Sequence, residues 1–275
     1  MTCLSEAKIE NGMRILVDSI FVGGTELPIT TLFPQDFENA NLNRILIAYG
    51  GTKDELFSDK VKNFWGPVLT GLGFVVHCFD YRSNLNASRF YEYGLNDRLI
   101  DLASVSAGLK GSFFGRSISN PFSSFPLSIM GVSMGGYLAA FVAAEFAGII
   151  DKLILVAPAA YNDAALSPDI KFGPDFSQII RRPNSWRSSS VFSRAAPKIK
   201  ADCLIVTFEN DDVVPSLIPT LYVSNLSSAV QGARFIESRV VTGSPGHKGT
   251  FDNTDRRDKI ARLISDFFTG LVLPD

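Results

Sequence analysis

A serine at the centre of a glycine-rich pentapeptide is the residue best placed to do chemistry. Residues 129–137 read Ile-Met-Gly-Val-Ser-Met-Gly-Gly-Tyr, so that Gly131 and Gly135 flank Ser133 two positions away on either side. An apolar run precedes this GxSxG motif and an alanine-rich helical stretch follows it, which is the context of a nucleophilic serine. The turn forces the serine into a strained conformation, and glycines are needed where a Cβ would collide with neighbouring backbone. We therefore predict that Ser133 is a nucleophile.

The same turn predicts half of an oxyanion hole. It exposes the Ser133 hydroxyl above a sheet and aims the first backbone N–H groups of the next helix at the same point, where negative charge is favoured. Met134, directly after the serine, would donate one of these hydrogen bonds. A chance glycine-rich turn is the alternative, and the flanking strand and helix patterns argue against it.

The base for this serine has to be one of only two histidines. Serine alone is a poor nucleophile near neutral pH, so it needs an imidazole to take its proton and a carboxylate to orient that imidazole. His77 lies inside a predicted strand, where a packed or locally hydrogen-bonded histidine is expected. His247 lies in the glycine-rich segment 242–249, late in the chain. Three carboxylates lie within four positions after another predicted strand: Glu209, Asp211 and Asp212.

Short aliphatic runs alternate with helical stretches along the chain, which predicts an α/β fold with a mainly parallel sheet and crossover helices. Near-continuous apolar runs suit central strands that are buried on both faces. These runs span 44–49, 74–79, 127–131, 153–157 and 203–208, and segments near 13–17 and 28–33 predict antiparallel edge strands.

Apolar residues spaced three and four apart predict helices at 59–72, 96–109, 134–146 and 258–268. Right-handed crossovers would place helices on both faces of the sheet and gather the carboxyl ends of the strands at one edge. We therefore expect the chemistry at that edge. The length of 275 residues is compatible with a single domain, 1–275.

Two stretches interrupt the alternation of strands and helices. Segment 111–126, rich in Ser, Phe, Pro and Gly, predicts a loop. Segment 160–201 is too long for a plain connection, so it is either a functional lid or disordered, and we favour a small lid. Seven basic residues outnumber three acidic ones in it, which indicates a solvated basic face or, alternatively, a surface that attracts an acidic group of the substrate.

The order of these features resembles the α/β-hydrolase superfamily, over nearly the whole chain from Pro28 to Leu271. Within it the chain is most similar to compact, lidded carboxylesterases and serine-peptidase-like hydrolases. Asp80-Tyr81-Arg82 after the fourth predicted strand and Asp101-Leu102 in the next helix carry this finer resemblance, although Ser83 and Asn84 stand where the superfamily often has a glycine. The resemblance implies the α/β-hydrolase fold, with a mostly parallel sheet of about eight strands, flanking helices and a small lid insertion.

The resemblance also implies the acid and the base. The superfamily order of serine, then acid, then histidine selects His247. Many members read Gly-x-x-Asp-x-Val-Val-Pro after the corresponding strand, and alignment of Val-Val-Pro at 213–215 puts Asp211 on the catalytic acid. Asp212 is the second candidate and Glu209 the third.

The second oxyanion donor is expected from the loop after the third predicted strand. The superfamily commonly has His-Gly-x there; Tyr49 replaces the histidine, Gly50 matches, and Gly51 would donate its N–H. Thr52 is the alternative donor, and a plain glycine turn is the alternative interpretation.

Charge and cysteine content exclude several classes of protein. A formal net charge of −2, from 26 basic and 28 acidic residues, gives no field that would attract nucleic acid. Three widely spaced cysteines without CxxC pairing indicate neither a disulfide framework nor a zinc site, and they fit a reducing compartment such as the cytoplasm. The charged first 18 residues argue against a signal peptide, and the apolar runs are too short to span a membrane.

The sequence thus predicts a serine hydrolase that cleaves a small-molecule carboxylic ester through an acyl-enzyme, without a metal, nucleotide or flavin cofactor. Hydrolysis of a thioester or amide with the same triad is an open alternative, because a triad does not encode the leaving group. A non-catalytic binding protein on the same fold is a third, less favoured, reading.

Overall fold

Nine strands form one sheet in the part of the chain that the computed structural model describes, which is residues 8–10, 12–36, 43–51, 53, 56–111, 125–228, 235–243, 246–248 and 252–270. In chain order the strands are β1 (Lys8–Glu10), β2 (Met13–Val22), β3 (Thr25–Phe33), β4 (Arg44–Ala48), β5 (Val75–Phe79), β6 (Leu127–Val132), β7 (Ile150–Val156), β8 (Asp202–Phe208) and β9 (Ile236–Val241). In space they follow the order β1-β2-β3-β5-β4-β6-β7-β8-β9. This agrees with the expected sheet of about eight strands, and the short, exposed β1, which carries no hydrophobic periodicity, is a strand that the sequence patterns did not locate.

The strand directions confirm the predicted arrangement of a parallel sheet with antiparallel strands at one edge. The pairs β1–β2, β2–β3 and β3–β5 are antiparallel, and every pair from β5 through β4 to β9 is parallel. The strands β2 and β3 are longer than the predicted segments 13–17 and 28–33, because they form one hairpin. Its turn is Gly23-Gly24, with φ of +54° and +80°, a backbone region that glycine adopts without steric cost.

The predicted helices at 96–109, 134–146 and 258–268 are present, whereas the helix Leu217–Ser227 was not predicted. The main ones are α2 (Gly66–Gly71), α4 (Leu95–Leu109), α5 (Met134–Glu145), α7 (Leu217–Ser227) and α9 (Thr254–Thr269), with short α1 (Phe57–Lys60) and α3 (Arg82–Leu85). The predicted single helix 59–72 is wrong in detail, because a π-helical turn at Val61–Trp65 separates α1 from α2. Pro67 lies in the first turn of α2, where its missing N–H removes a backbone donor.

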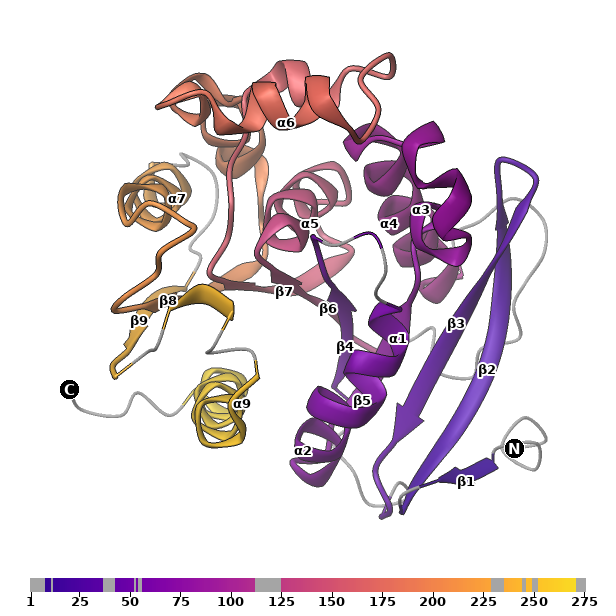
Figure 1. Cartoon of the computed structure of the whole chain (residues 1–275). Coiled ribbons are helices and arrows are strands. Elements are labelled where there is room, and N and C mark those ends of the chain that lie inside the picture. Colours follow the sequence, from indigo (N-terminus) through magenta and orange to yellow (C-terminus); the bar gives the residue numbers. More distant parts are fainter. Residues whose placement is uncertain are drawn as a thin grey trace.

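Helices cover both faces of the sheet. Figure 1 shows α2 and α9 on one face and α4, α5 and α7 on the other. The two innermost parallel strands, β4 and β6, are buried along their whole length. None of the helices within the described ranges combines the length and the apolar character that crossing a membrane requires.

Segment 160–201 is folded throughout. It contains α6 (Pro174–Arg181) and short helical turns at Asp163–Leu166, Ser185–Ser188, Val191–Ala195 and Ala196–Lys198. Its side chains Phe172, Phe176, Trp186 and Phe192 are buried in the same hydrophobic core as the residues of the sheet and its helices. Figure 1 shows α6 lying above α4 and α5. The predicted loop 111–126 lies mostly outside the described residues, which omit 112–124.

His77 lies in the middle of the sheet on β5 and is fully buried, with its Nδ1 2.9 Å from the Thr31 hydroxyl. Burial lowers the pKa of His77 to about 3, and the positive charge of Arg44 adds to the effect. In the unfolded chain a histidine takes up a proton below a pH of about 6.5. His77 therefore contributes stability that is present above pH 6.5 and is lost as the pH falls from there toward 3.

We expect the free energy of unfolding to fall by about 2 kcal/mol more between pH 7 and pH 5 in the parent protein than in His77→Gln, which has no imidazole to titrate. Urea unfolding of both proteins at the two pH values measures this difference. An equal loss of stability in the two proteins would show that His77 takes up a proton while the protein is folded.

Candidate active site

Ser133 occupies a sharp turn between β6 and α5. Its φ of +55° and ψ of −118° lie in a region that non-glycine residues rarely adopt. Backbone hydrogen bonds hold it there: the Ser133 N–H donates to Val156 O at 3.0 Å, and the Ser133 carbonyl accepts from Gly136 N at 2.9 Å and from Ala159 N at 3.0 Å. A strained residue that is held by three bonds indicates a functional position.

The glycines around Ser133 are required by close backbone packing. A Cβ at Gly135 would overlap the carbonyl oxygen of Ala48 at the end of β4, and a Cβ at Gly131 would overlap the backbone of Gly135 and Gly136. The first turn of α5 therefore lies directly against the sheet. This contact sets the height of Ser133 above the strand ends.

Gly135→Ala should lower the free energy of unfolding by about 2 kcal/mol or more, because backbone atoms must move to admit the methyl group. Gly71→Ala is the matched control: Gly71 ends α2 on the surface, has no positive φ, and a Cβ there meets nothing within 4 Å. We expect its stability to stay within about 1 kcal/mol of the parent. Urea denaturation of both variants measures the effect, and equal stabilities would contradict the packing argument.

His247 links Ser133 to a carboxylate although it is 114 residues away in sequence from the serine. Its Nε2 lies 3.0 Å from Ser133 Oγ, and its Nδ1 lies 2.8 Å from Asp211 Oδ2. With the proton on Nδ1 donated to Asp211, Nε2 can accept the serine proton. The His247 side chain is 7% exposed, so little water competes for these bonds.

The three candidate carboxylates have separate partners. Asp211 accepts from the backbone N–H groups of Val213 at 2.9 Å and Val214 at 2.7 Å with Oδ1, which leaves Oδ2 for the imidazole. Asp212 accepts instead from the backbone N–H of His247 at 2.7 Å, a bond that lowers the pKa of Asp212. Glu209 accepts from Gly243 N at 2.7 Å. Asp211 is thus the carboxylate on the imidazole, and the other two hold the backbone of the histidine loop.

Both of the favoured oxyanion donors line the same cavity as Ser133 and His247. The cavity has a volume of about 350 Å³, and Gly51 and Met134 are among its lining residues. Gly50 brings the loop after β4 against the start of α5, since a Cβ on it would overlap the Met134 side chain. Thr52, the alternative donor, lies outside the described residues.

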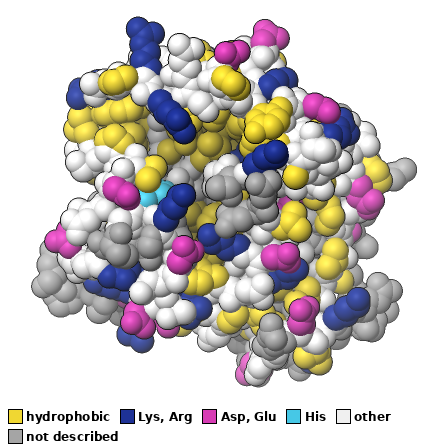
Figure 2. Space-filling model, in the orientation of Figure 1, with side chains coloured by type: hydrophobic (Ala, Val, Ile, Leu, Met, Phe, Trp, Pro, Cys, Tyr) yellow, Lys and Arg dark blue, Asp and Glu magenta, His cyan; other side chains and the backbone are white. Residues whose placement is uncertain are grey.

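The cavity also has walls that the sequence patterns did not single out. Tyr161, at the start of segment 160–201, and Val213, beside the acid, contribute apolar surface. Lys60, Lys248 and Asp252 contribute charges, with Lys60 3.7 Å from Asp252. Figure 2 shows the histidine at the edge of a hollow, with hydrophobic and basic side chains around it. Lys248 directly follows the predicted base, which is the one signal that could have pointed to it.

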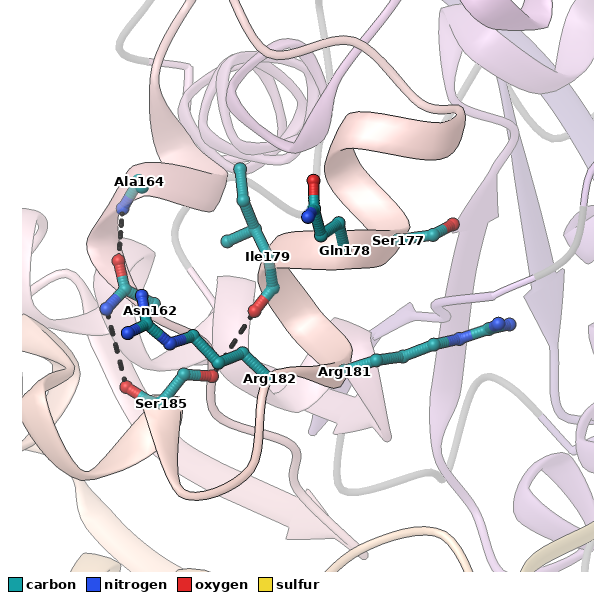
Figure 3. A pocket seen from close by; sticks show the side chains of 8 residues that line it. All are labelled: Asn162, Ala164, Ser177, Gln178, Ile179, Arg181, Arg182 and Ser185. Atoms are coloured by element: carbon teal, nitrogen blue, oxygen red, sulfur yellow. Dashed lines mark hydrogen bonds between the residues drawn. The ribbon is translucent and has the colours of Figure 1, made fainter.

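A larger cavity of about 750 Å³ lies within segment 160–201. Figure 3 shows Arg181 and Arg182 at its border, pointing in different directions, with Asn162 bonded to Ala164 N and Ser185 O. None of the arginines or lysines of this segment lines the Ser133 cavity in the described structure. The cations at that cavity come from other segments, so the proposed attraction of an acidic substrate group by the basic segment gains no support here.

No protein-family model matches the chain, and no curated protein is detectably similar to it in sequence. Solved structures are similar to it in fold. A dienelactone hydrolase from Anabaena variabilis matches with a TM-score of 0.63 and 16% identity, covering 96% of this chain and 100% of the other. Esterase 2 from Thermogutta terrifontis matches with a TM-score of 0.66 and 16% identity, covering 98% of each chain.

An acylaminoacyl peptidase from Pyrococcus horikoshii matches with a TM-score of 0.65 and 15% identity over 94% of this chain, which spans only 41% of the peptidase. At these identities the matches show the fold, and TM-scores of 0.63 to 0.66 indicate one shared architecture. The chain has the α/β-hydrolase fold that its sequence resembles.

Proposed function

We propose that the protein is a serine hydrolase that cleaves a carboxylic ester through an acyl-enzyme on Ser133. The observation that carries this proposal is the hydrogen-bonded chain from Ser133 through His247 to Asp211, opening into one cavity with Met134 and Gly51. Such a chain activates the serine as a nucleophile, and the serine can react only where a substrate reaches its hydroxyl. The cavity provides that access.

The reaction would proceed in two halves. His247 Nε2 takes the Ser133 proton as Oγ attacks the ester carbonyl carbon, and the carbonyl oxygen becomes an oxyanion that the N–H groups of Met134 and Gly51 stabilise. His247 then gives the proton to the leaving alcohol as the C–O bond breaks, which leaves the acyl group on Ser133. Water, deprotonated by His247, attacks the acyl-enzyme, and the carboxylic acid leaves as Ser133 Oγ recovers the proton.

The size and lining of the cavity favour a short acyl group. Its volume of about 350 Å³ is near the lower end for small-molecule sites, and Tyr49, Val132 and Tyr161 give it apolar surface. Because Tyr161 belongs to segment 160–201, we propose that this segment forms a small lid on a single domain that spans 1–275.

An amide or thioester remains the second candidate for the scissile bond. The peptidase among the similar structures acts on a different bond from the esterase, although the fold is shared.

Cys78 and Cys203 form no disulfide in the described structure, which fits a reducing compartment, so we propose a cytoplasmic location.

Turnover of matched acyl donors tests the proposal. Butyrate would be offered as the p-nitrophenyl ester, the coenzyme A thioester and the p-nitroanilide, with acetyl and octanoyl esters added to probe the acyl pocket. We expect the butyryl ester to be cleaved fastest and a fluorophosphonate to label Ser133. No turnover of any donor together with no labelling would exclude a serine hydrolase and favour the binding protein.

A further inference from the structure

Arg98 is a fully buried arginine on α4, with 0% of its surface exposed. Its Nε donates to the Ser83 hydroxyl at 3.0 Å, its Nη2 donates to Asn84 Oδ1 at 2.9 Å, and its Nη1 lies 3.5 Å from Met134 Sδ. All three partners are neutral. Within the described residues Arg98 forms no ion pair, because Asp101, one turn further along α4, is held by Arg82 at 2.6 Å.

A ring of aromatic side chains surrounds this guanidinium. Its central carbon lies 4.6 Å from the ring centre of Phe172, 5.0 Å from Tyr81, 5.8 Å from Phe90 and 5.9 Å from Phe57. Aromatic faces attract a cation but neutralise none of its charge. Burial lowers the pKa of Arg98 to about 10, so the side chain still carries its proton near neutral pH.

A buried cation without an ion pair lowers the free energy of unfolding, so the position of Arg98 points to a role other than stabilising the fold. Met134, which Arg98 contacts, lines the Ser133 cavity and is the predicted oxyanion donor, and Gly50 is packed closely against its Cβ. The Met134 side chain is therefore clamped between the loop after β4 and the guanidinium. Both elements of the expected oxyanion hole meet at this clamp.

We propose that Arg98 is a positioning residue for the oxyanion hole: it fixes Met134 through the side chain and places a positive charge behind the N–H donors. The inference rests on the proposed function. A preorganised charge in a water-excluded region stabilises negative charge that develops in the transition state more than it stabilises the neutral ester. Loss of this charge should therefore lower kcat and leave KM nearly unchanged.

Arg98→Met tests this, because methionine fills an aromatic cage well and carries no charge. We expect kcat for p-nitrophenyl butyrate to fall by about 10- to 100-fold while KM stays within about twofold. Arg98→Lys keeps the charge but loses the planar fork that reaches Ser83, Asn84 and Met134, so a smaller fall in kcat of about 3- to 10-fold is expected. Rates are expressed per active site, counted by the burst of a fluorophosphonate leaving group, so that only folded enzyme contributes.

Arg44→Met is the matched control. Arg44 is also 0% exposed, and burial lowers its pKa to about 10 as well. It lies at the amino end of β4, the opposite end of the strand from the Ser133 cavity, and donates to the carbonyl oxygens of Leu109 and Phe125. Its replacement should lower the free energy of unfolding, while kcat per active site stays within about twofold of the parent.

The outcomes separate the possible roles of Arg98. A kcat within about threefold of the parent in Arg98→Met, or an equal fall in Arg44→Met, would overturn the proposal and leave Arg98 a structural residue. If Arg98→Met does not fold, Arg98→Lys decides, because unaltered kcat in that variant would contradict the role of the guanidinium. A parent protein that cleaves no ester and takes no fluorophosphonate label would instead defeat the proposed function, and this inference with it.

Discussion

Ser133→Ala should lower kcat/KM for p-nitrophenyl butyrate by about 10⁴-fold or more, the largest effect of any single substitution in this chain. Alanine removes the hydroxyl that is proposed to form the acyl-enzyme, and what remains is direct attack of water on the bound ester, aided only by the oxyanion donors. Labelling by a fluorophosphonate should disappear at the same time. Product formation at fixed times measures the loss of activity, and intact-protein mass spectrometry of the same preparation measures the loss of labelling.

Ser128→Ala is the matched control for this substitution. Ser128 lies on the same strand, β6, is 1% exposed, and its hydroxyl has no hydrogen-bond partner in the described structure. Removal of an unsatisfied buried hydroxyl should leave activity unchanged and stability equal or slightly higher. Retention of more than about a hundredth of the parent activity in Ser133→Ala would contradict the nucleophile assignment.

Asp211→Asn should lower kcat by about 10³- to 10⁴-fold and leave the fold intact. The amide oxygen can still accept from the N–H groups of Val213 and Val214, so the turn keeps its hydrogen bonds. The amide nitrogen then faces His247 Nδ1 as a donor, which favours the tautomer with its proton on Nε2. That tautomer cannot accept the Ser133 proton.

Asp212→Asn tests whether Asp212, rather than its neighbour Asp211, is the catalytic acid. Its side-chain oxygen can still accept from the backbone N–H of His247, so only a surface charge is lost. We expect kcat within about tenfold of the parent, with steady-state kinetics at saturating p-nitrophenyl butyrate as the measurement. A large loss in Asp212→Asn together with a small one in Asp211→Asn would reverse the assignment of the acid.

The sequence by itself determined the parts of this protein that depend on neighbouring residues. The GxSxG motif placed Ser133 between a strand and a helix, and the structure has Ser133 at the junction of β6 and α5. Apolar runs located the central strands to within three residues, because a strand buried on both faces shows in its own composition. The three-residue β1 was not predicted because it has no hydrophobic period, and the π-helical turn at Val61–Trp65 was not predicted because apolar residues spaced three and four apart indicate a helix without showing where it is interrupted.

Only the tertiary structure decided which groups meet. Asp211 and Asp212 are adjacent acidic residues in one turn. The backbone of that turn directs Asp211 to the His247 imidazole and Asp212 to the His247 backbone N–H, and the composition of the turn does not reveal this difference. The contact of Arg98 with Met134 joins residues 36 apart, and that of Ser133 with His247 joins residues 114 apart. Such contacts depend on how the sheet brings distant segments together, whereas a sequence pattern reports only what lies within a turn or a strand.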